Sequence, residues 1–356
     1  QEISSLEPSA NDSLKKTKTL QNQLPNLRIS NDDSYWNKYE NLNINTTSGV
    51  NQTTEKLPNI VFHLVKQLKS GTDLSKITLP AFILEKQSLL ELFSEILLPL
   101  ELLVEAALDD DPKLRLLRLG SLFVNGLAYS RQSMLPKKPY NPILGEFFKC
   151  KFNVNLNKIK NKENFNKFGL NDSDTLVFDF VAEQVSHHPP SNIISELEFF
   201  NTFDILCLND HRTFLNPFIS AFYCENKILG ISVSGSLYTK SRFLGVSIAC
   251  DFVGKTILSF DSIDDTYTVS LPSAYGNGIF SNPWLEMAGK CIITSMKTGH
   301  TGTIEFKPSK FLIRGRNEVT CKFFEPNSEF PYSELAGRWT EKIEFVDKEV
   351  IIIRFN

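Results

Sequence analysis

Residues 228–271 read ILGISVSGSLYTKSRFLGVSIACDFVGKTILSFDSIDDTYTVSL, which is a series of short runs rich in β-branched and aromatic residues. Gly, Asp and Ser separate the runs, as they do at turns between strands. Many short strands in series predict an antiparallel sheet or barrel from about residue 140 onward. Further runs of the same kind are TLVFDFVAEQ (175–184), KCIITS (290–295) and TGTIEF (301–306).

The chain before these strands has a helical pattern. In LPNIVFHLVKQLKSG (57–71) apolar residues recur at helical spacing, Pro58 suits a first turn and Gly71 suits a stop. Because helices precede the strand-rich part, the sequence predicts an α+β fold. The expected helices are an amphipathic one over 58–70 and longer segments around 87–108 and 112–132.

Two segments are too polar for us to expect them in a packed core. Of the first 55 residues, 22 are Asn, Ser or Thr, so residues 1–56 are expected to form a disordered leader. Residues 153–175 are rich in Asn and Lys and interrupt two strand patterns. They are expected to form a mobile loop.

The composition excludes several classes of protein. With 356 residues of which 41% are hydrophobic, the chain can build a substantial core. The 38 basic and 41 acidic residues give a net charge of −3, so no nucleic-acid partner is expected and any polyanion must meet a local cluster. The most apolar stretch, 89–108, carries four glutamates, so no transmembrane helix is expected.

Aromatic and sulfur-containing residues add two expectations. The 28 phenylalanines, against nine tyrosines and three tryptophans, indicate a large apolar interior wall or an AT-rich coding bias. The six cysteines form no CxxC pair, so we expect reduced thiols of a cytosolic protein, with no metal and no cofactor.

The adjacent histidines His187 and His188 in EQVSHHPP (183–190) are the most distinctive polar feature of a chain that lacks the common catalytic motifs. As metal ligands they would diverge on an extended backbone and lack a third ligand. They can be ordinary loop histidines. They can also bind an anion, since two prolines hold the backbone extended and imidazoles bond to phosphate.

A second segment, KKPYNPILGEFF (137–148), supports the phosphate interpretation. Lys137 and Lys138 supply cationic donors and Asn141 supplies an amide donor, while two prolines and Gly145 stiffen the turn. Taken alone, the same segment is equally a polar surface loop between a helix and the first strand.

Together, EQVSHHPP (183–190) and KPYNPILGE (138–146) resemble the paired fingerprint of the oxysterol-binding-protein-related family. The segments DLSKITLPAFILE (73–85), ALDDDPKLRL (107–116) and 219–247 are similar to further landmarks of that family in the same order. The resemblance implies a lipid-transfer domain over 57–348. Its expected fold is an incomplete antiparallel β-barrel around a hydrophobic tunnel, with a helical segment before it and an N-terminal lid helix.

The resemblance also implies a ligand and its contacts. Phosphatidylinositol 4-phosphate would place its headgroup at the tunnel mouth, where His187 and His188 bind the 4-phosphate. Lys138 and Asn141 would contact the glycerol-side phosphate and the inositol, and Glu146 would order the entrance. The expected lid and tunnel-entrance residues are Ile60, Leu64, Leu68, Leu79 and Ile83.

The second ligand depends on the branch of the family. Residues 73–85 and 138–146 look most like the branch that exchanges phosphatidylserine for phosphatidylinositol 4-phosphate, and a sterol exchanger is the alternative. A sensor or scaffold that binds the phosphoinositide without carrying it, and a hydrolase with a histidine base, are rival functions. We expect a cytoplasmic protein that contacts membranes transiently, at endoplasmic reticulum contact sites.

Two segments depart from the family pattern. Residues 191–218 separate HHPP from a strand that normally follows it at once, and residues 349–356 stand where a C-terminal helical region would continue. Translated intron sequence would produce both departures, and the alternative is an authentic insertion with an authentic truncation. We predict that neither segment is a structural part of the domain.

Overall fold

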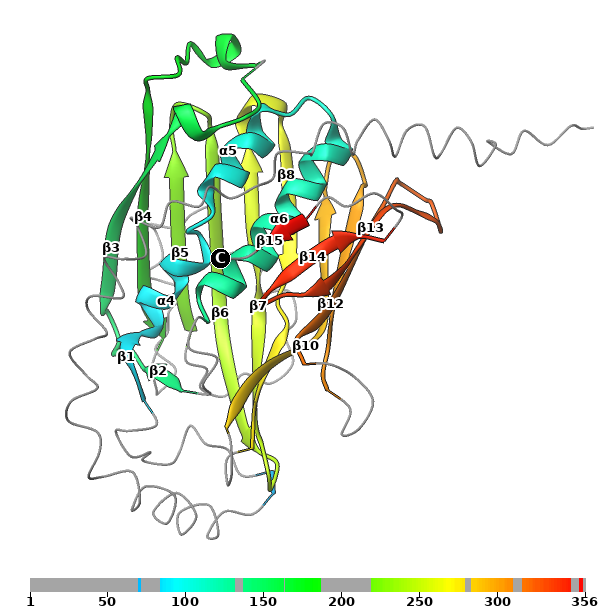
Figure 1. Ribbon diagram of the computed structural model, residues 1–356. Helices are drawn as coiled ribbons and strands as arrows, with labels where there is room; N and C mark the ends of the chain where they lie inside the picture. The colour runs from blue at the N-terminus through cyan, green and yellow to red at the C-terminus, as the bar shows by residue number, and fades with distance from the viewer. Residues whose placement is uncertain are drawn as a thin grey trace, which may run out of the picture.

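The computed structural model describes residues 70–71, 84–131, 137–162, 164–186, 219–278, 283–309 and 316–346, together with the backbone of residues 352–354. One large, strongly curved sheet dominates the fold, and three helices lie against its concave face (Figure 1). Within the described residues no helix combines the length and the apolar character that a membrane span requires.

The main sheet has thirteen strands, and the neighbouring strands pair antiparallel. Its order is β15-β14-β13-β12-β11-β10-β8-β7-β6-β5-β4-β3, and β9 pairs with β7 and β10. The strands are β3 (Phe147–Asn155), β4 (Thr175–Ser186), β5 (Ile219–Asn226), β6 (Ile231–Phe243), β7 (Ile248–Phe260), β8 (Asp265–Ser270), β9 (Ser273–Asn277), β10 (Trp284–Ser295), β11 (Thr301–Lys307), β12 (Glu318–Phe324), β13 (Pro331–Arg338), β14 (Lys342–Phe345) and β15 (Ile352–Arg354).

The sheet is a barrel that does not close. Its two end strands, β3 and β15, each pair with only one neighbour in the described part of the chain. The incomplete antiparallel β-barrel expected from the sequence is thus confirmed, and so is the α+β class.

Alternating side chains explain why these runs form strands. Along β4, Leu176, Phe178, Phe180 and Ala182 point to the core and are buried, while the residues between them are more exposed. This period of two is what a sheet with one buried face requires. β6 and β7, which come from the stretch quoted first, pair over thirteen residues from Ile231↔Phe260 to Phe243↔Ile248.

The helices begin and end where the sequence supplies caps. Ser88 caps α4 (Leu89–Ile96) by accepting a bond from the Leu90 amide at 3.2 Å, and the Glu91 carboxylate accepts one from the Ser88 amide at 3.1 Å. Pro99 separates α4 from α5 (Leu100–Leu108). α6 (Pro112–Tyr129) starts with Pro112 in its first turn, which confirms the expected helix there.

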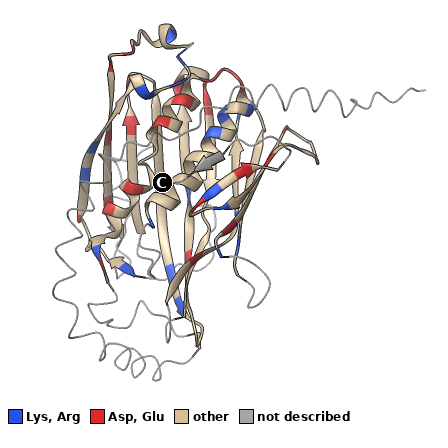
Figure 2. Ribbon diagram, viewed as in Figure 1, with Lys and Arg blue, Asp and Glu red and all other residues tan. Residues whose placement is uncertain are grey.

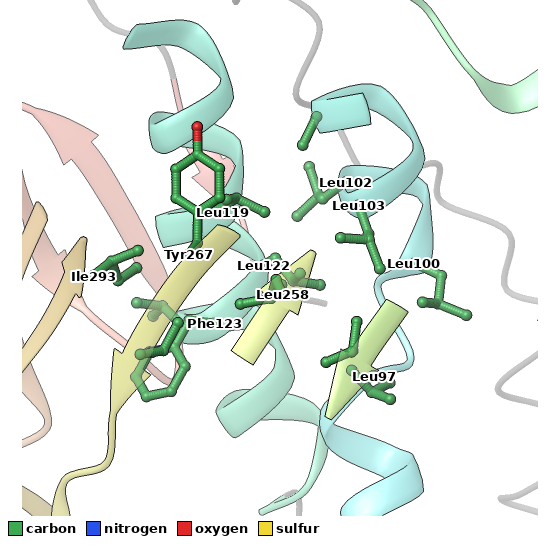
Figure 3. Packing of buried hydrophobic residues seen from close by; sticks show 14 of the residues in the cluster. Leu97, Leu100, Leu102, Leu103, Leu119, Leu122, Phe123, Leu258, Tyr267 and Ile293 are labelled. Atoms are coloured by element: carbon green, nitrogen blue, oxygen red, sulfur yellow. The ribbon is translucent and has the colours of Figure 1, made fainter. Parts of the chain in front are cut away.

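The helices pack on the concave face of the sheet through large aliphatic side chains. Figure 3 shows Leu119, Leu122 and Phe123 of α6 beside Leu258 of β7 and Tyr267 of β8, with the α5 leucines close by. Burial of each such side chain stabilises the fold by roughly 1.5–3 kcal/mol. The helices therefore form one core with the sheet.

Residues 153–175 differ from the mobile loop expected from their composition. After β3 they form two short 3-10 helices, η4 (Leu156–Lys158) and η5 (Phe165–Phe168), and four apolar side chains in this part of the segment are buried. Asn161 Nδ2 donates to Asp109 Oδ1 at 2.6 Å and Asn164 Nδ2 donates to the Leu108 carbonyl at 2.6 Å. The asparagines thus fasten the segment to the end of α5. The buried apolar side chains are Leu156, Ile159, Phe165 and Leu170.

Several expectations lie outside the described residues: the leader over 1–56, the lid helix over 58–70 and the insert over 191–218. At the other end of the chain, β15 falls within 349–356 and pairs with β14 through Ile343↔Ile353, so this part of the segment belongs to the sheet, which differs from the expectation that 349–356 is not a structural part of the domain. Cys207 is also outside the described residues, and the other five cysteines are free thiols, three of them buried.

Candidate functional site

The concave side of the sheet encloses an apolar cavity. It lies between α4, α6 and strands β5, β6, β7, β8 and β10, and its empty volume is about 1010 Å³, counting the part that opens to solvent. Phe93 of α4, Phe123 of α6 and Met287 of β10 are among the lining residues. Only four polar residues, Ser130, Arg131, Ser236 and Thr256, line it among the described residues. Such walls suit a ligand that is largely hydrocarbon.

Phenylalanine rings form part of the wall, as the composition predicted. The Phe222 ring of β5 lies 5.4 Å from that of Phe93 and 6.2 Å from that of Phe180, measured between ring centroids. Gly235, which pairs with Phe222 across β5 and β6, makes room for this ring. A Cβ atom at Gly235 would lie 2.5 Å from the Phe222 ring.

One end of the cavity is bordered by a small parallel sheet of β1 (Leu84–Ser88) and β2 (Lys138–Tyr140). Ser88 pairs with Tyr140 and directly precedes Leu89, which lines the cavity. The KPYNPILGE segment therefore begins beside the cavity. We call this end of the cavity its mouth.

The turn after β2 is fixed to the end of β4. The Gly145 amide donates to the Gln184 carbonyl at 3.0 Å, and the Gln184 amide donates to the Glu146 carbonyl at 2.9 Å. The Glu146 carboxylate accepts bonds from the Ile143 amide at 3.0 Å and the Ser88 hydroxyl at 3.3 Å. KPYNPILGE thus lies side by side with the first half of EQVSHHPP.

Lys138, Asn141 and Glu146 lie in this mouth, but their exposure differs. Asn141 is exposed, while Lys138 and Glu146 are half-buried. Burial lowers the pKa of the Lys138 ammonium group. Lys138 forms no ion pair with the charged residues that the structure describes. Glu146 holds the turn through the two bonds given above, as expected of a residue that orders the entrance.

The two histidines cannot be placed in the same way. His187 and His188, like Ile60, Leu64, Leu68, Leu79 and Ile83, lie outside the described residues. β4 ends at Ser186, however, so the chain reaches His187 directly after the strand that holds Gly145 and Glu146.

Two further charged residues near the mouth were not predicted. Arg131, the second residue after the end of α6, lines the cavity, and burial lowers the pKa of its guanidinium group. Burial raises the pKa of the Glu95 carboxyl group on α4 to about 7, while the nearby Arg131 opposes that shift. The Glu95 carboxylate accepts a bond from Gln87 Nε2 at 2.9 Å. No sequence motif marks either residue, because their neighbours come from distant segments.

The charges elsewhere do not form a field of one sign. Figure 2 shows Lys and Arg interspersed with Asp and Glu over the described helices and strands. The overall charge distribution therefore does not favour a ligand of either sign.

An open antiparallel barrel with helices on its concave face, an apolar cavity and a polar mouth defines a lipid-binding domain. The family model described as oxysterol-binding protein matches residues 63–199 and 211–351. The chain belongs to this family, whose members bind and transfer lipids.

Curated relatives support the same assignment. The chain is 31% identical over 328 residues to oxysterol-binding protein-related protein 9 of Xenopus tropicalis, which covers 92% of this chain and 40% of the relative. It is 32% identical to the human oxysterol-binding protein-related protein 10, and this match covers 80% of this chain and 35% of the relative. The chain thus spans about two fifths of the length of the curated relatives it matches.

Solved structures show the same fold. The Osh3 ORD of Saccharomyces cerevisiae in complex with PI(4)P aligns with a TM-score of 0.55 and 19% identity, over 81% of this chain and 62% of that one. The Osh1 ORD domain in complex with ergosterol aligns with a TM-score of 0.57 and 25% identity, over 83% and 59%. The Osh1 ORD domain in complex with cholesterol aligns with a TM-score of 0.58 and 23% identity, over 98% of this chain and 68% of that one.

Proposed function

We propose that this protein extracts phosphatidylinositol 4-phosphate and a second lipid from membranes and exchanges them, without covalent chemistry. The observation that carries the proposal is the pair of hydrogen bonds that joins Gly145 and Glu146 to Gln184. They hold Lys138 and Asn141 beside the chain that leads into His187 and His188, at the mouth of an apolar cavity.

The two parts of the site suit the two parts of this lipid. Acyl chains leave one apolar environment for another when they move from a bilayer into the cavity, so their transfer costs little free energy. The headgroup supplies the selectivity, because phosphate groups accept charge-assisted hydrogen bonds from lysine and imidazole donors. The Osh3 domain, which shares the fold, was solved in complex with PI(4)P.

Phosphatidylserine is the proposed second lipid. The support is the likeness of residues 73–85 and 138–146 to the branch of the family that carries it. Sterol is the second candidate, since Osh1 domains of the same fold were solved with ergosterol and with cholesterol. Competitive loading from vesicles that contain both lipids decides between them, and an excess of recovered sterol would reverse the choice.

The mouth also has a surface suited to a membrane. In the turn after β2 and the start of β3, the side chains of Ile143, Leu144 and Phe147 are 67%, 53% and 62% exposed. Exposed apolar side chains gathered on one loop are typical of an interaction surface. We propose that this loop inserts into the bilayer surface while lipid passes through the mouth, in the cytoplasm and at endoplasmic reticulum contact sites.

The test is extraction of phosphatidylinositol 4-phosphate from phosphatidylcholine vesicles by the full chain. Replacement of both His187 and His188 by Ala removes two bonds to phosphate, each worth roughly 1–3 kcal/mol, so extraction should weaken by roughly tenfold or more. His211→Ala is the matched control. Unchanged extraction by the double variant would refute the headgroup site, and extraction without delivery to acceptor vesicles would favour a sensor.

A further inference from the structure

Three arginines lie between the start of α6 and the second residue after its end, and their charges are satisfied in different ways. Arg115 donates to the Ala106 carbonyl at 3.2 Å and also to the Asp109 carbonyl. Arg118 forms ion pairs with Glu105 and Asp109. Both side chains are buried, and both have their partners within the protein.

Arg131 differs from them in both respects. Its side chain lines the apolar cavity, and within the described part of the chain its guanidinium group has no hydrogen bond, ion pair or cation–π contact. A half-buried cation without a partner costs free energy, because the lost hydration is not replaced. Arg115 and Arg118 on α6 show that the fold supplies hydrogen-bond and ion-pair partners to buried arginines nearby.

The groups around Arg131 form no ion pair with it in the part of the chain that the structure describes. The charged and titratable neighbours are Glu85 of β1, Glu95 of α4 and the Cys250 thiol of β7. Neither carboxylate forms an ion pair with Arg131, and Glu95 is instead bonded to Gln87. Burial raises the pKa of both Glu95 and Cys250, which favours their neutral forms. Among the described residues, then, no carboxylate pairs directly with the Arg131 guanidinium group, although Glu85 and Glu95 both act on it electrostatically.

Lys138 lies near the same point. Its ammonium group and the Arg131 guanidinium group are both within electrostatic reach of the Cys250 thiol. Two half-buried cations, Lys138 on β2 and Arg131 after α6, thus lie within electrostatic reach of the same thiol. An anion placed there would replace the hydration that both have lost.

We propose that Arg131 is a further lipid-binding residue, which pairs with the anionic part of a bound glycerophospholipid on the cavity side of Lys138. This inference rests on the proposed function, because that function supplies the identity of the lipid. A planar guanidinium group can hold a phosphate or a carboxylate through two parallel bonds. Arg131 would thereby favour phospholipids over sterols, which carry no anionic group.

The test compares the wild-type chain with Arg131→Gln in the uptake of three lipids from phosphatidylcholine vesicles: phosphatidylinositol 4-phosphate, phosphatidylserine and ergosterol. We expect Arg131→Gln to bind both anionic lipids roughly tenfold less tightly, while any uptake of ergosterol is unchanged. Arg131→Lys should retain part of the affinity. The control is Arg242→Gln, since Arg242 is exposed and paired with Asp251 at 2.8 Å.

Thermal unfolding of the lipid-free protein separates ligand binding from a structural role. Removal of an unpaired cation should leave the melting temperature unchanged or raise it, whereas loss of a structural arginine would lower it. The proposal is overturned by unchanged phospholipid uptake, by equal loss of all three lipids, or by a lower melting temperature. Wild-type uptake of phosphatidylserine without the phosphoinositide would refute the proposed function alone. Wild-type uptake of ergosterol alone would refute both.

Discussion

The carbonyl oxygen of Gln184 accepts a hydrogen bond from the amide of Gly145 at 3.0 Å, and this bond joins two motifs that lie about forty residues apart in the chain. Gly145 has a φ of 77°, a conformation that favours glycine, and this positive φ lets the turn bring its amide to β4. The headgroup site thus depends on a turn that a side chain at this position would strain.

Glu146→Ala should loosen that turn. The substitution removes the acceptor of the Ile143 amide and the Ser88 hydroxyl, so the free energy of unfolding should fall by roughly 1–2 kcal/mol and phosphoinositide uptake should fall with it. Chemical denaturation and vesicle extraction measure the two effects. Glu146→Gln keeps a carbonyl acceptor and should lose less stability. Equal stability of the alanine variant and the wild type would contradict this role.

Substitution of both Ile143 and Leu144 by Asp should weaken binding to vesicles by roughly tenfold or more, because two apolar side chains would no longer leave water at the bilayer surface. Flotation with phosphatidylcholine vesicles measures the effect. The matched control is Ile228→Asp, since Ile228 is 57% exposed in the turn between β5 and β6, at the opposite end of β5 from the mouth. Equal loss in both variants would mean that the loop has no special part in docking.

Glu95 should make stability depend on pH. Its pKa is raised from 4.5 to about 7, so between these values the folded state binds more protons than the unfolded state. The contribution of Glu95 is therefore fully present below pH 4.5 and is lost as the pH rises to about 7. Glu95→Gln should remove this dependence, so its stability relative to wild type should rise from pH 5 to pH 8 in denaturant titrations. A constant difference over that range would refute the shift.

Deletion of residues 1–70 should leave a domain that takes up lipid but loses it readily. The expected helix over 58–70 has one apolar face suited to covering the cavity mouth. A soluble quencher should therefore reach a fluorescent lipid in the truncated protein faster than in the full chain. Deletion of residues 1–56 alone is the control, and equal protection in the full chain and the longer deletion would refute the lid.

Deletion of residues 191–218 should raise the soluble yield and the melting temperature. Ser186 and Ile219 are paired neighbours at adjacent ends of β4 and β5, and the deletion leaves only residues 187–190 between them. Four residues are a common length for a hairpin loop. Unfolding of the shortened protein would show that the insert is an authentic part of the domain, and sequencing of the mature transcript tests the intron explanation independently.

The sequence predicted the strands and the pairing of the two motifs better than it predicted the cavity wall. Alternation along β4 and the β-branched runs of β6 and β7 are local patterns, so they can be read from the chain alone. The burial of Leu156 and Phe165 was missed because the surrounding asparagines and lysines dominate the composition. Arg131 was missed because its isolation depends on what α4, β1 and β7 place around it.

The order of the strands has a consequence for how the protein folds. Most strands of the sheet pair with their neighbours in the sequence, although β8 and β9 do not, and most connections are short, with 156–174 and 308–317 among the longer ones. Consecutive hairpins can form one after another, because each new strand closes only a small loop when it pairs. The longest connection is the one between β4 and β5, which residues 187–218 separate in the chain. Each doubling of a loop costs only about 0.6 kcal/mol of chain entropy, so the long connection should delay the meeting of the two halves of the sheet far more than it weakens the finished fold.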